Sequence, residues 1–214
     1  AKSRGLVRTE GHKQGAEVFR RISRYCADVG VKYLTFYAFS TENWKRSAGE
    51  VEAIMNLLRD YLAELQRREE ENEFENVSIR FLGAREGMAD DIVQMMNLIE
   101  AQTASRTKIH INIAVNYGGR DELIRAMQKA AEPLTEQALS ALLDTADSGD
   151  VDLFIRTGGE LRISNFLLWQ IAYAELYFTD VKWPDFTREE LIKAMQDFAR
   201  RERRFGGLKT DGAK

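Results

Sequence analysis

The sequence predicts an α/β protein with a mostly parallel central sheet that helices cover on both faces. Short runs rich in β-branched and aromatic residues alternate with helical apolar patterns along the whole chain, and this alternation is typical of parallel sheets. The chain has 214 residues, enough for one sizeable core, and it contains no stretch that resembles a linker. We therefore expect a single domain over residues 1–214.

Two adjacent patterns predict the first helix and the first strand. Between residues 12 and 29 apolar side chains recur three and four apart, and Gly30 then ends the pattern. Residues 31–39 are rich in β-branched and aromatic types, which is the composition of a central strand. A polar loop, residues 40–46, follows this strand.

The next three elements are a long helix, a short strand and a second helix. Ser47 and Glu50 have the spacing of a capping box, and the helix that they begin continues through residue 65. Residues 77–81 alternate as a strand. The helix of residues 92–99 is apolar over more than one face, which is compatible with core packing or with the wall of an apolar cavity.

The second half of the chain repeats the alternation. Residues 109–115 predict a strand, followed by a loop with two glycines at residues 116–120 and a helix to residue 131. Thr135 is the expected cap of a short helix. A short strand at residues 176–181 and a final helix from Thr187 complete the pattern.

Residues 151–164 combine a short apolar strand with the features of an anion site. Glycines can turn backbone N–H groups toward a ligand, a helix N-terminus adds partial positive charge, and guanidinium groups can grip phosphate oxygens. A carboxylate facing such a site would indicate a divalent metal between the two, and Glu175 is the candidate. Each residue alone also fits an ordinary turn and core helix. The set comprises Arg156, Gly158, Gly159, Arg162, and the Ser164–Asn165 pair that is expected to begin an apolar helix.

Three predicted strands end in loops with polar or glycine residues. These loops are residues 40–46, 116–120 and 156–164. Ligands bind at the carboxyl ends of strands in open parallel sheets, so we expect the three loops to converge on one crevice.

Charge and cysteine content exclude several classes of protein. The formal net charge is −3, so the chain lacks the basic field that polymeric nucleic acid requires, and arginines near glycine turns indicate a small anionic ligand instead. A single cysteine, Cys26, cannot form an internal disulfide and fits a reducing compartment. The sequence has no apolar run of membrane-spanning length. We expect a cytoplasmic protein.

Four segments resemble the cis-prenyltransferases, and in particular their bacterial undecaprenyl diphosphate synthase branch. They are residues 37–46, 111–120, 156–186 and 200–207, and the resemblance runs nearly from end to end. It implies a Mg²⁺-dependent enzyme that extends farnesyl diphosphate with isopentenyl diphosphate units in cis geometry, making the lipid carrier of cell-wall polysaccharides. Growth of an apolar chain requires a dry tunnel, and the helices of residues 51–65 and 92–99 are the candidates to line it.

The resemblance also implies roles for individual residues. Asn43 matches a position to which the family assigns proton removal, but an amide is a poor base, so we expect it to orient the substrate. Glu175 would bind Mg²⁺, while Arg120, Asp152 and Asp185 would support the site. The remaining matches are substrate-binding positions: Arg8, His12, Ser40, Thr41, Glu42, Trp44, Arg46, Arg156, Arg162, Ile163 and Ser164.

One departure from the family pattern leads to a second hypothesis. The family opens with an aspartate–glycine motif that binds Mg²⁺ and the allylic diphosphate, and this sequence begins where that motif would just have ended. We expect the motif to belong to a segment outside the given sequence. The alternatives are a non-catalytic partner subunit of a cis-prenyltransferase and a generic phosphate-binding domain. The resemblance further implies a homodimer, built in part by residues 203–207, and peripheral contact with the inner face of the membrane through the lipid product.

Overall fold

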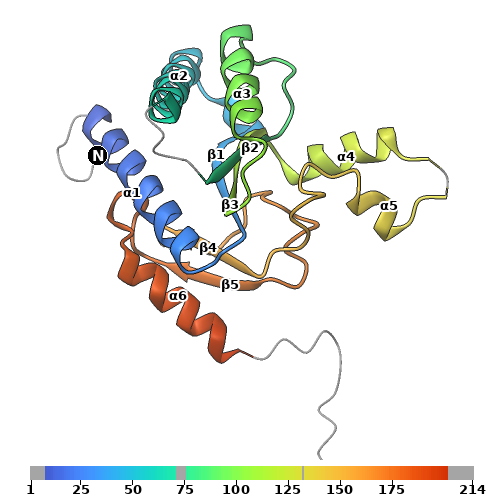
Figure 1. Ribbon diagram of the computed structural model, residues 1–214. Helices are drawn as coiled ribbons and strands as arrows, with labels where there is room; N and C mark the ends of the chain where they lie inside the picture. Colours follow the sequence, from blue (N-terminus) through green and yellow to red (C-terminus); the bar gives the residue numbers. More distant parts are fainter. Residues whose placement is uncertain (1–7, 71–75, 132, 202–214) are drawn as a thin grey trace, which may run out of the picture.

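A computed structural model describes residues 8–70, 76–131 and 133–201 (Figure 1). Its helices are α1 (Arg8–Asp28), α2 (Ala48–Glu70), α3 (Asp90–Thr103), α4 (Gly119–Lys129), α5 (Glu136–Ser140) and α6 (Arg188–Arg200). Its strands are β1 (Tyr33–Ser40), β2 (Val77–Leu82), β3 (Ile109–Tyr117), β4 (Leu153–Thr157) and β5 (Glu175–Thr179). Two 3₁₀ helices are η2 (Thr41–Lys45) and η3 (Trp183–Asp185).

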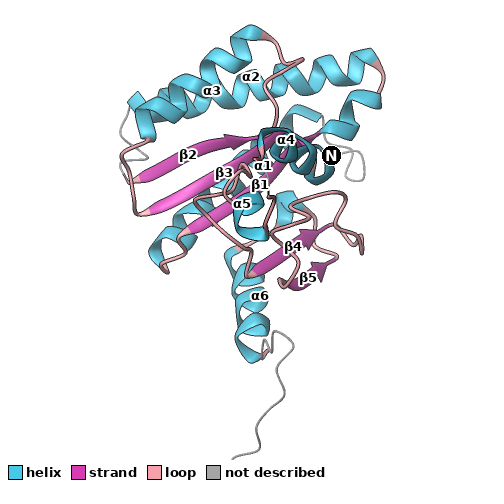
Figure 2. Cartoon of the chain, turned by 90° about the vertical axis from the view of Figure 1, so that its right-hand side faces the viewer, coloured by secondary structure: helices cyan, strands magenta, loops and turns pink. Residues whose placement is uncertain are grey.

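The strands form two parallel sheets. One has the order β1-β3-β2 and the other pairs β4 with β5, and every pairing is parallel. Figure 2 shows the two sheets one beyond the other, with α2 and α3 along the three-stranded sheet and α6 beyond the two-stranded one. The predicted α/β class with parallel strands is confirmed, but the described strands are divided between two sheets where one was expected.

Local signals placed several helix ends correctly. The Thr135 side chain accepts a hydrogen bond from Ala138 N at the start of α5, and Thr187 accepts one from Glu190 N at the start of α6. The Ser47 hydroxyl donates to the Glu50 carboxylate just before α2, which is a contact between two side chains and not the reciprocal side-chain-to-backbone bonding of a capping box. The predicted Thr135 cap is confirmed, and the final helix begins after Thr187 as predicted.

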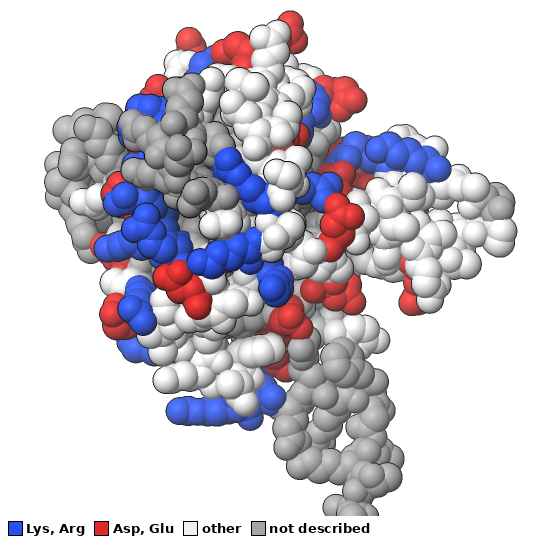
Figure 3. All heavy atoms as spheres, in the orientation of Figure 1, with Lys and Arg blue, Asp and Glu red and all other residues white. Residues whose placement is uncertain are grey.

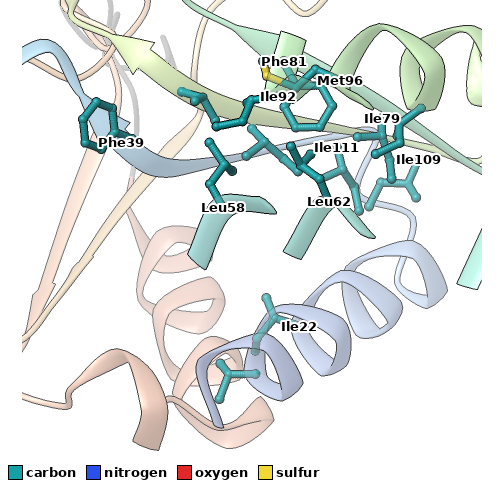
Figure 4. Packing of buried hydrophobic residues seen from close by; sticks show 14 of the residues in the cluster. Ile22, Phe39, Leu58, Leu62, Ile79, Phe81, Ile92, Met96, Ile109 and Ile111 are labelled. Carbon is teal, nitrogen blue, oxygen red and sulfur yellow. The ribbon is translucent and has the colours of Figure 1, made fainter. Parts of the chain in front are cut away.

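The core lies between the three-stranded sheet and the helices around it. β3 is buried at nearly every position, on both of its faces, which requires cover on both sides of the sheet. Figure 4 shows side chains from α1, α2, α3 and all three strands packed together. The α3 residues Ile92, Met96 and Ile99 are at most 1% exposed and belong to this cluster. Core packing is thus their role, and they do not form a tunnel wall.

Two predictions about individual elements were wrong. Residues 31–39 were expected to be a central strand, yet β1 lies at the edge of its sheet and β3 is central. The segment after Ser164 was expected to be a helix, but residues 164–173 form turns. Ser164, Asn165 and Leu167 all have φ between 48° and 62°, and L-residues in this left-handed region cannot continue a right-handed helix.

Within the described ranges, no helix combines the length and the apolar character needed to cross a membrane.

Candidate functional site

Asn165 joins three loops at the carboxyl ends of β1, β3 and β4. Its backbone carbonyl accepts from Gly119 N (2.7 Å) and its side-chain oxygen accepts from Arg120 N (3.0 Å). Its side-chain nitrogen donates to Glu42 in the loop after β1 (2.7 Å). The predicted convergence of the loops at 40–46, 116–120 and 156–164 is confirmed by these contacts.

Gly118 permits the close approach of these loops. A Cβ atom at this position would lie 2.6 Å from Thr41 Oγ1 and 2.8 Å from Asn165 Nδ2. Both distances are shorter than real contacts of a side-chain carbon allow. The absence of a side chain therefore matters here for packing, whereas the backbone of Gly118 is extended and suits any residue.

The loop after β1 is held by its own side chains. Asn43 Oδ1 accepts a hydrogen bond from Ser40 N (3.0 Å), and Trp44 Nε1 donates to Asn116 Oδ1 on β3 (2.7 Å). The Trp44 ring packs edge-on against Phe39 while 37% of the residue is exposed. Because its amide oxygen already has a partner, Asn43 has its NH₂ group to offer a ligand, which suits orientation better than proton removal.

Glu42 is ionised more readily than an ordinary glutamate. Partial burial raises the pKa of Glu42, but hydrogen bonds from Asn165 and from groups of its own loop outweigh that effect, and the pKa lies below its usual value. The carboxylate is therefore charged at neutral pH and keeps its bond to Asn165.

Arg156 is fixed within the turn that follows β4. Its guanidinium donates to the carbonyl of Arg162 (2.6 Å) and to the hydroxyl of Ser164 (2.8 Å). The Arg162 side chain is 61% exposed and pairs with Glu160. The turn thus holds one guanidinium rigidly and leaves a second one largely in solvent, where it can reorient toward an anion.

The two glycines of this turn do not serve the ligand. Gly158 N donates to Val181 O and Gly159 N donates to Thr179 O, so both N–H groups are bonded to the chain around the end of β5. Their φ values of 91° and 82° suit glycine. The expectation that these N–H groups face a phosphate was wrong. The glycines shape the turn, and the side chains of Arg156, Arg162 and Ser164 are its available donors.

A large apolar cavity opens beside the turn. Its volume is about 1370 Å³, which exceeds the roughly 300–1,000 Å³ of ordinary small-molecule pockets. Arg156, Ile163 and Ser164 lie in its wall at one end. One side of α2 supplies much of the remaining wall, with Ile54, Leu57, Leu58, Tyr61, Leu62 and Leu65. The predicted apolar tunnel corresponds to this cavity, with α2 as its helical wall.

Glu175 lies away from this end of the cavity. It opens β5 and is in register with Leu153, the first residue of β4, whereas Arg156 is near the end of β4. Three residues of strand separate the two positions by roughly 10 Å along the sheet. The Glu175 carboxylate instead accepts from Arg201 (2.8 Å). Within this chain the predicted metal ligand and the predicted phosphate ligand therefore do not face each other.

The other predicted site residues are distributed around the three loops. Thr41 touches the region of Gly118, and Arg46 follows η2 with an exposed side chain. Arg120 donates its backbone N–H to Asn165, the carbonyl of Asp152 accepts from Glu175 N, and Asp185 is the last residue of η3.

The backbones of Arg8 and His12 belong to the first turns of α1, but their side chains lie outside the described residues, as do residues 203–207.

A buried polar network behind the site was not predicted from the sequence. Glu122 is 1% exposed and accepts hydrogen bonds from the Tyr117 hydroxyl, the Gln170 amide and Asp144 N. Burial raises the pKa of Glu122, and the bonds from Tyr117 and Gln170 offset part of that rise. Glu122 resembles an ordinary acid in the first turn of a helix, so no sequence signal marks it. The network fixes α4 against the end of β3.

Charges of both signs are interspersed on the surface. Figure 3 shows basic side chains gathered over the middle of one face, with acidic side chains among them. This arrangement suits a local anion site better than a polyanion track. Among the residues that the structure describes, no group of three or more His, Cys, Asp or Glu side chains could hold a metal ion.

Comparisons with known proteins agree with this geometry. Residues 1–206 match the family described as putative undecaprenyl diphosphate synthase. An isoprenyl transferase of Aquifex pyrophilus is 48% identical over 210 residues, covering 96% of this chain and 90% of that protein. The isoprenyl transferase of Listeria monocytogenes is 44% identical over 218 residues, covering 97% and 85%.

Two solved structures share the fold. A probable undecaprenyl diphosphate synthase from Campylobacter jejuni has a TM-score of 0.84 at 37% identity, covering 91% of this chain and 92% of that one. Lavandulyl diphosphate synthase from Lavandula x intermedia, in complex with dimethylallyl diphosphate, has a TM-score of 0.88 at 30% identity, covering 96% and 92%.

Proposed function

We propose that this chain, which belongs to the undecaprenyl diphosphate synthase family of isoprenyl transferases, condenses isopentenyl diphosphate units onto farnesyl diphosphate in cis geometry. The proposed product is undecaprenyl diphosphate, the precursor of the lipid carrier for cell-wall polysaccharides. Prenyl transfer follows from the family. The identity of the two substrates and of the product is the proposal.

One observation supports the proposal most strongly. A cavity of about 1370 Å³ with apolar walls ends at a turn where Arg156 is held by Arg162 O and Ser164. An isoprenoid diphosphate has the matching shape, with a charged head and a long apolar chain. Burial of that chain contributes about 0.8 kcal/mol per CH₂ group, while a charge-assisted hydrogen bond to the head contributes roughly 1.5–3 kcal/mol.

The residues of the three loops can divide the chemistry between them. Arg156, Arg162 and Ser164 would bind the isopentenyl diphosphate, and Ile163 would contact its apolar part. Ser40, Thr41, Glu42, Trp44 and Arg46 would cover the reacting ends, with the NH₂ group of Asn43 orienting the substrate. Arg8 and His12 would contact the allylic diphosphate. Exclusion of water by the loop strengthens each charge interaction as the allylic bond ionises.

Mg²⁺ is the cation that we propose for the reaction, with Glu175 as its candidate ligand. Bound Mg²⁺ would stabilise the charge of the departing diphosphate. Oxygen ligands are appropriate, because Mg²⁺ is commonly held by one or two carboxylates together with substrate phosphates. The geometry of the described residues does not complete such a site, since Glu175 pairs with Arg201 and lies roughly 10 Å along the sheet from Arg156.

The test is an assay of the full-length protein with farnesyl diphosphate, labelled isopentenyl diphosphate and Mg²⁺. Mass spectrometry of the extracted lipid should show a ladder ending at eleven isoprene units, if the proposal is right. A shorter terminal product would correct the product while retaining the reaction. A folded protein that makes no product, with or without a second cis-prenyltransferase chain, would reject catalysis. Activity that appears in the second chain after mixing would favour the partner-subunit alternative.

We also propose a homodimer in the cytoplasm that contacts the membrane surface through its lipid product. Light scattering of the purified protein tests the first part, since a dimer of this chain has twice the 24.5 kDa mass of the monomer. Flotation with liposomes, with and without bound product, tests the second.

A further inference from the structure

Asn116, near the carboxyl end of β3, joins two loops through one buried side chain. The residue is 5% exposed and has a φ of 49°, a left-handed conformation that asparagine tolerates better than most other residues do. Its side-chain oxygen accepts from Trp44 Nε1 (2.7 Å) in the loop after β1. Its side-chain nitrogen donates to the carbonyls of Ala84 (3.0 Å) and Glu86 (3.1 Å) in the loop after β2. These three bonds form a bridge between loops that follow different strands.

The partners of the Asn116 amide determine which way it points. An asparagine side chain has two N–H donors and one oxygen acceptor. The two carbonyls of the loop after β2 can only accept, and the indole N–H of Trp44 can only donate. The reverse orientation would therefore place N–H groups against the indole and the oxygen against two carbonyls. Because each lost partner would leave a buried polar group unsatisfied, this amide is costly to disturb.

The loop after β2, residues 83–88, is itself held by two elements. Ala84 N donates to the backbone carbonyl of Asn116 (3.2 Å). A Cβ atom at Gly83 would lie 2.8 Å from that same oxygen, so the loop lies directly against the end of β3. Arg85 pairs with Glu100 of α3 (3.1 Å). The loop therefore gives the amide a fixed base on β3 and α3.

Trp44 is the exposed partner of the bridge. It belongs to η2, and 37% of the residue is exposed although its ring packs edge-on against Phe39. Lys45 and Arg46, which follow it, are exposed as well. The bond to Asn116 thus helps to hold a loop that otherwise faces solvent. Loss of this bond should increase the fraction of molecules in which the loop is open.

We propose that Asn116 is a positioning residue for prenyl transfer. Its amide, oriented by the carbonyls of residues 84 and 86, holds Trp44 and thereby keeps the loop of residues 40–46 closed over the substrates. Asn116 acts through Trp44 and not on the reacting groups. The bridge is a property of the fold, whereas the role of the loop as a cover rests on the proposed function.

The first test is nuclear magnetic resonance of the indole N–H groups in the full-length protein, with the Trp44 signal assigned from Trp44→Phe. Asn116→Gly retains the positive φ but removes the bridge, so exchange of the Trp44 indole proton with water should become roughly 2- to 10-fold faster. Asn116→Asp still accepts from Trp44 but has lost both donors. In this variant the amides of Ala84 and Met88, which are bonded in the native protein, should exchange faster while the indole proton stays protected.

The wild-type protein and Asn116→Asp decide the question if Asn116→Gly does not fold. A Trp44 indole proton that exchanges in the wild-type protein as fast as that of free tryptophan would overturn the proposal. Unchanged exchange in a folded Asn116→Gly protein would overturn it too.

A double-mutant cycle separates action through Trp44 from general destabilisation. Trypsin should cut after Arg46 roughly 2- to 10-fold faster in Asn116→Gly, and kcat/KM for prenyl transfer should fall by a similar factor. In a Trp44→Phe background the same substitution should change either quantity by no more than about twofold. A full effect in that background would overturn the proposal.

Asn112→Ala is the matched control for the loss of a buried amide. Asn112 is 3% exposed on the same strand, and its side chain donates to Thr35 (3.4 Å), away from both loops. This variant should leave the rate of cleavage after Arg46 unchanged. Faster cleavage in Asn112→Ala, equal to that in Asn116→Gly, would show that any destabilised β3 opens the loop and would overturn the specific role of Asn116.

Failure of the proposed function would give a different result. An inactive wild-type protein with the expected indole exchange and cleavage rates would reject prenyl transfer, and with it the positioning role, while confirming the bridge. An active wild-type protein whose kcat/KM is unchanged in Asn116→Gly would reject the positioning role alone.

Discussion

The side-chain amide of Asn165 donates a 2.7 Å hydrogen bond to the carboxylate of Glu42, which lies 123 residues earlier in the chain. Asn165 also accepts from Gly119 N and Arg120 N. A single residue therefore ties the loop after β1 to the start of α4 and to the turn after β4. We infer that Asn165 is a positioning residue for the loop that would cover the substrates.

Replacing Asn165 by glycine should release the loop after β1 without straining the backbone, because glycine also tolerates the φ of 62°. The variant loses two side-chain hydrogen bonds, the one donated to the Glu42 carboxylate and the one accepted from Arg120 N. Loss of the bond to the charged partner alone corresponds to roughly tenfold or more in kcat/KM. Limited trypsin digestion should cut faster after Lys45 and Arg46. Glu42→Ala should reproduce both effects, whereas Glu42→Gln, which still accepts from Asn165, should show them weakly. Unchanged kinetics and digestion in Asn165→Gly would remove the positioning role.

A bulky side chain in the cavity wall should shorten the product. Leu57 lies on α2 and lines the cavity, so Leu57→Trp fills space that a growing prenyl chain would occupy. The terminal product should lose one or more isoprene units while the first condensation remains active. Ala63→Trp on the exposed side of the same helix is the matched control and should leave the product length unchanged. An identical product ladder in both variants would show that the chain grows elsewhere.

The Glu175–Arg201 pair allows the metal assignment to be tested. Glu175→Gln removes a carboxylate and should raise the Mg²⁺ concentration for half-maximal activity by about tenfold. Arg201→Gln frees the carboxylate from its 2.8 Å ion pair and should lower that concentration or leave it unchanged. If both variants lose activity to the same extent and neither shifts the Mg²⁺ titration, Glu175 has a structural role alone.

Cys26 should be unreactive in the native protein. The residue is 2% exposed, and burial raises the pKa of its thiol to about 11. At pH 8 the native thiolate fraction is then about 10⁻³, against about 10⁻¹ for a thiol of ordinary pKa. Because the folded pKa is the higher one, this group contributes stability that is present below about pH 9 and lost as pH rises toward 11.

Alkylation of Cys26 measures the reactivity of its thiol directly. Labelling by iodoacetamide at pH 8 should be slow in the native state and should become fast in denaturant. The melting temperature should fall as the pH rises from 8 to 11. This fall should be smaller in Cys26→Ala, once the destabilisation caused by the lost side chain is subtracted. Rapid stoichiometric labelling of the native protein would contradict the buried position.

The strand and helix pattern could be predicted from the sequence because local signals determine it. Hydrophobic periodicity, capping residues and terminal glycines located the helices: Thr135 caps α5 as expected, and α6 begins after Thr187 as expected. The convergence of three loops followed from one rule about parallel sheets. In contrast, the segment after Ser164 has an apolar helical pattern but forms turns, because three residues with positive φ are held there by tertiary contacts such as those of Asn165.

Site details depended on contacts that the sequence does not display. Gly158 and Gly159 signal a turn, but the sequence cannot tell that their N–H groups bond to the chain around β5. A helix after Ser164 would place Glu175 opposite the phosphate site. With that helix replaced by turns, Glu175 begins β5 at the amino edge and meets Arg201. The burial of Glu122 has no sequence signal, because buried acids show no periodic pattern.

The central claim is that the turn after β4 binds the diphosphate of isopentenyl diphosphate through Arg156. Isothermal titration of isopentenyl diphosphate into the full-length protein and its Arg156→Ala variant tests it most directly. Arg80→Ala, which removes an exposed arginine paired with Asp147 elsewhere, is the matched control. We predict that Arg156→Ala weakens binding roughly 10- to 150-fold and that Arg80→Ala does not change it. Equal affinity of the wild-type and Arg156→Ala proteins would contradict the account.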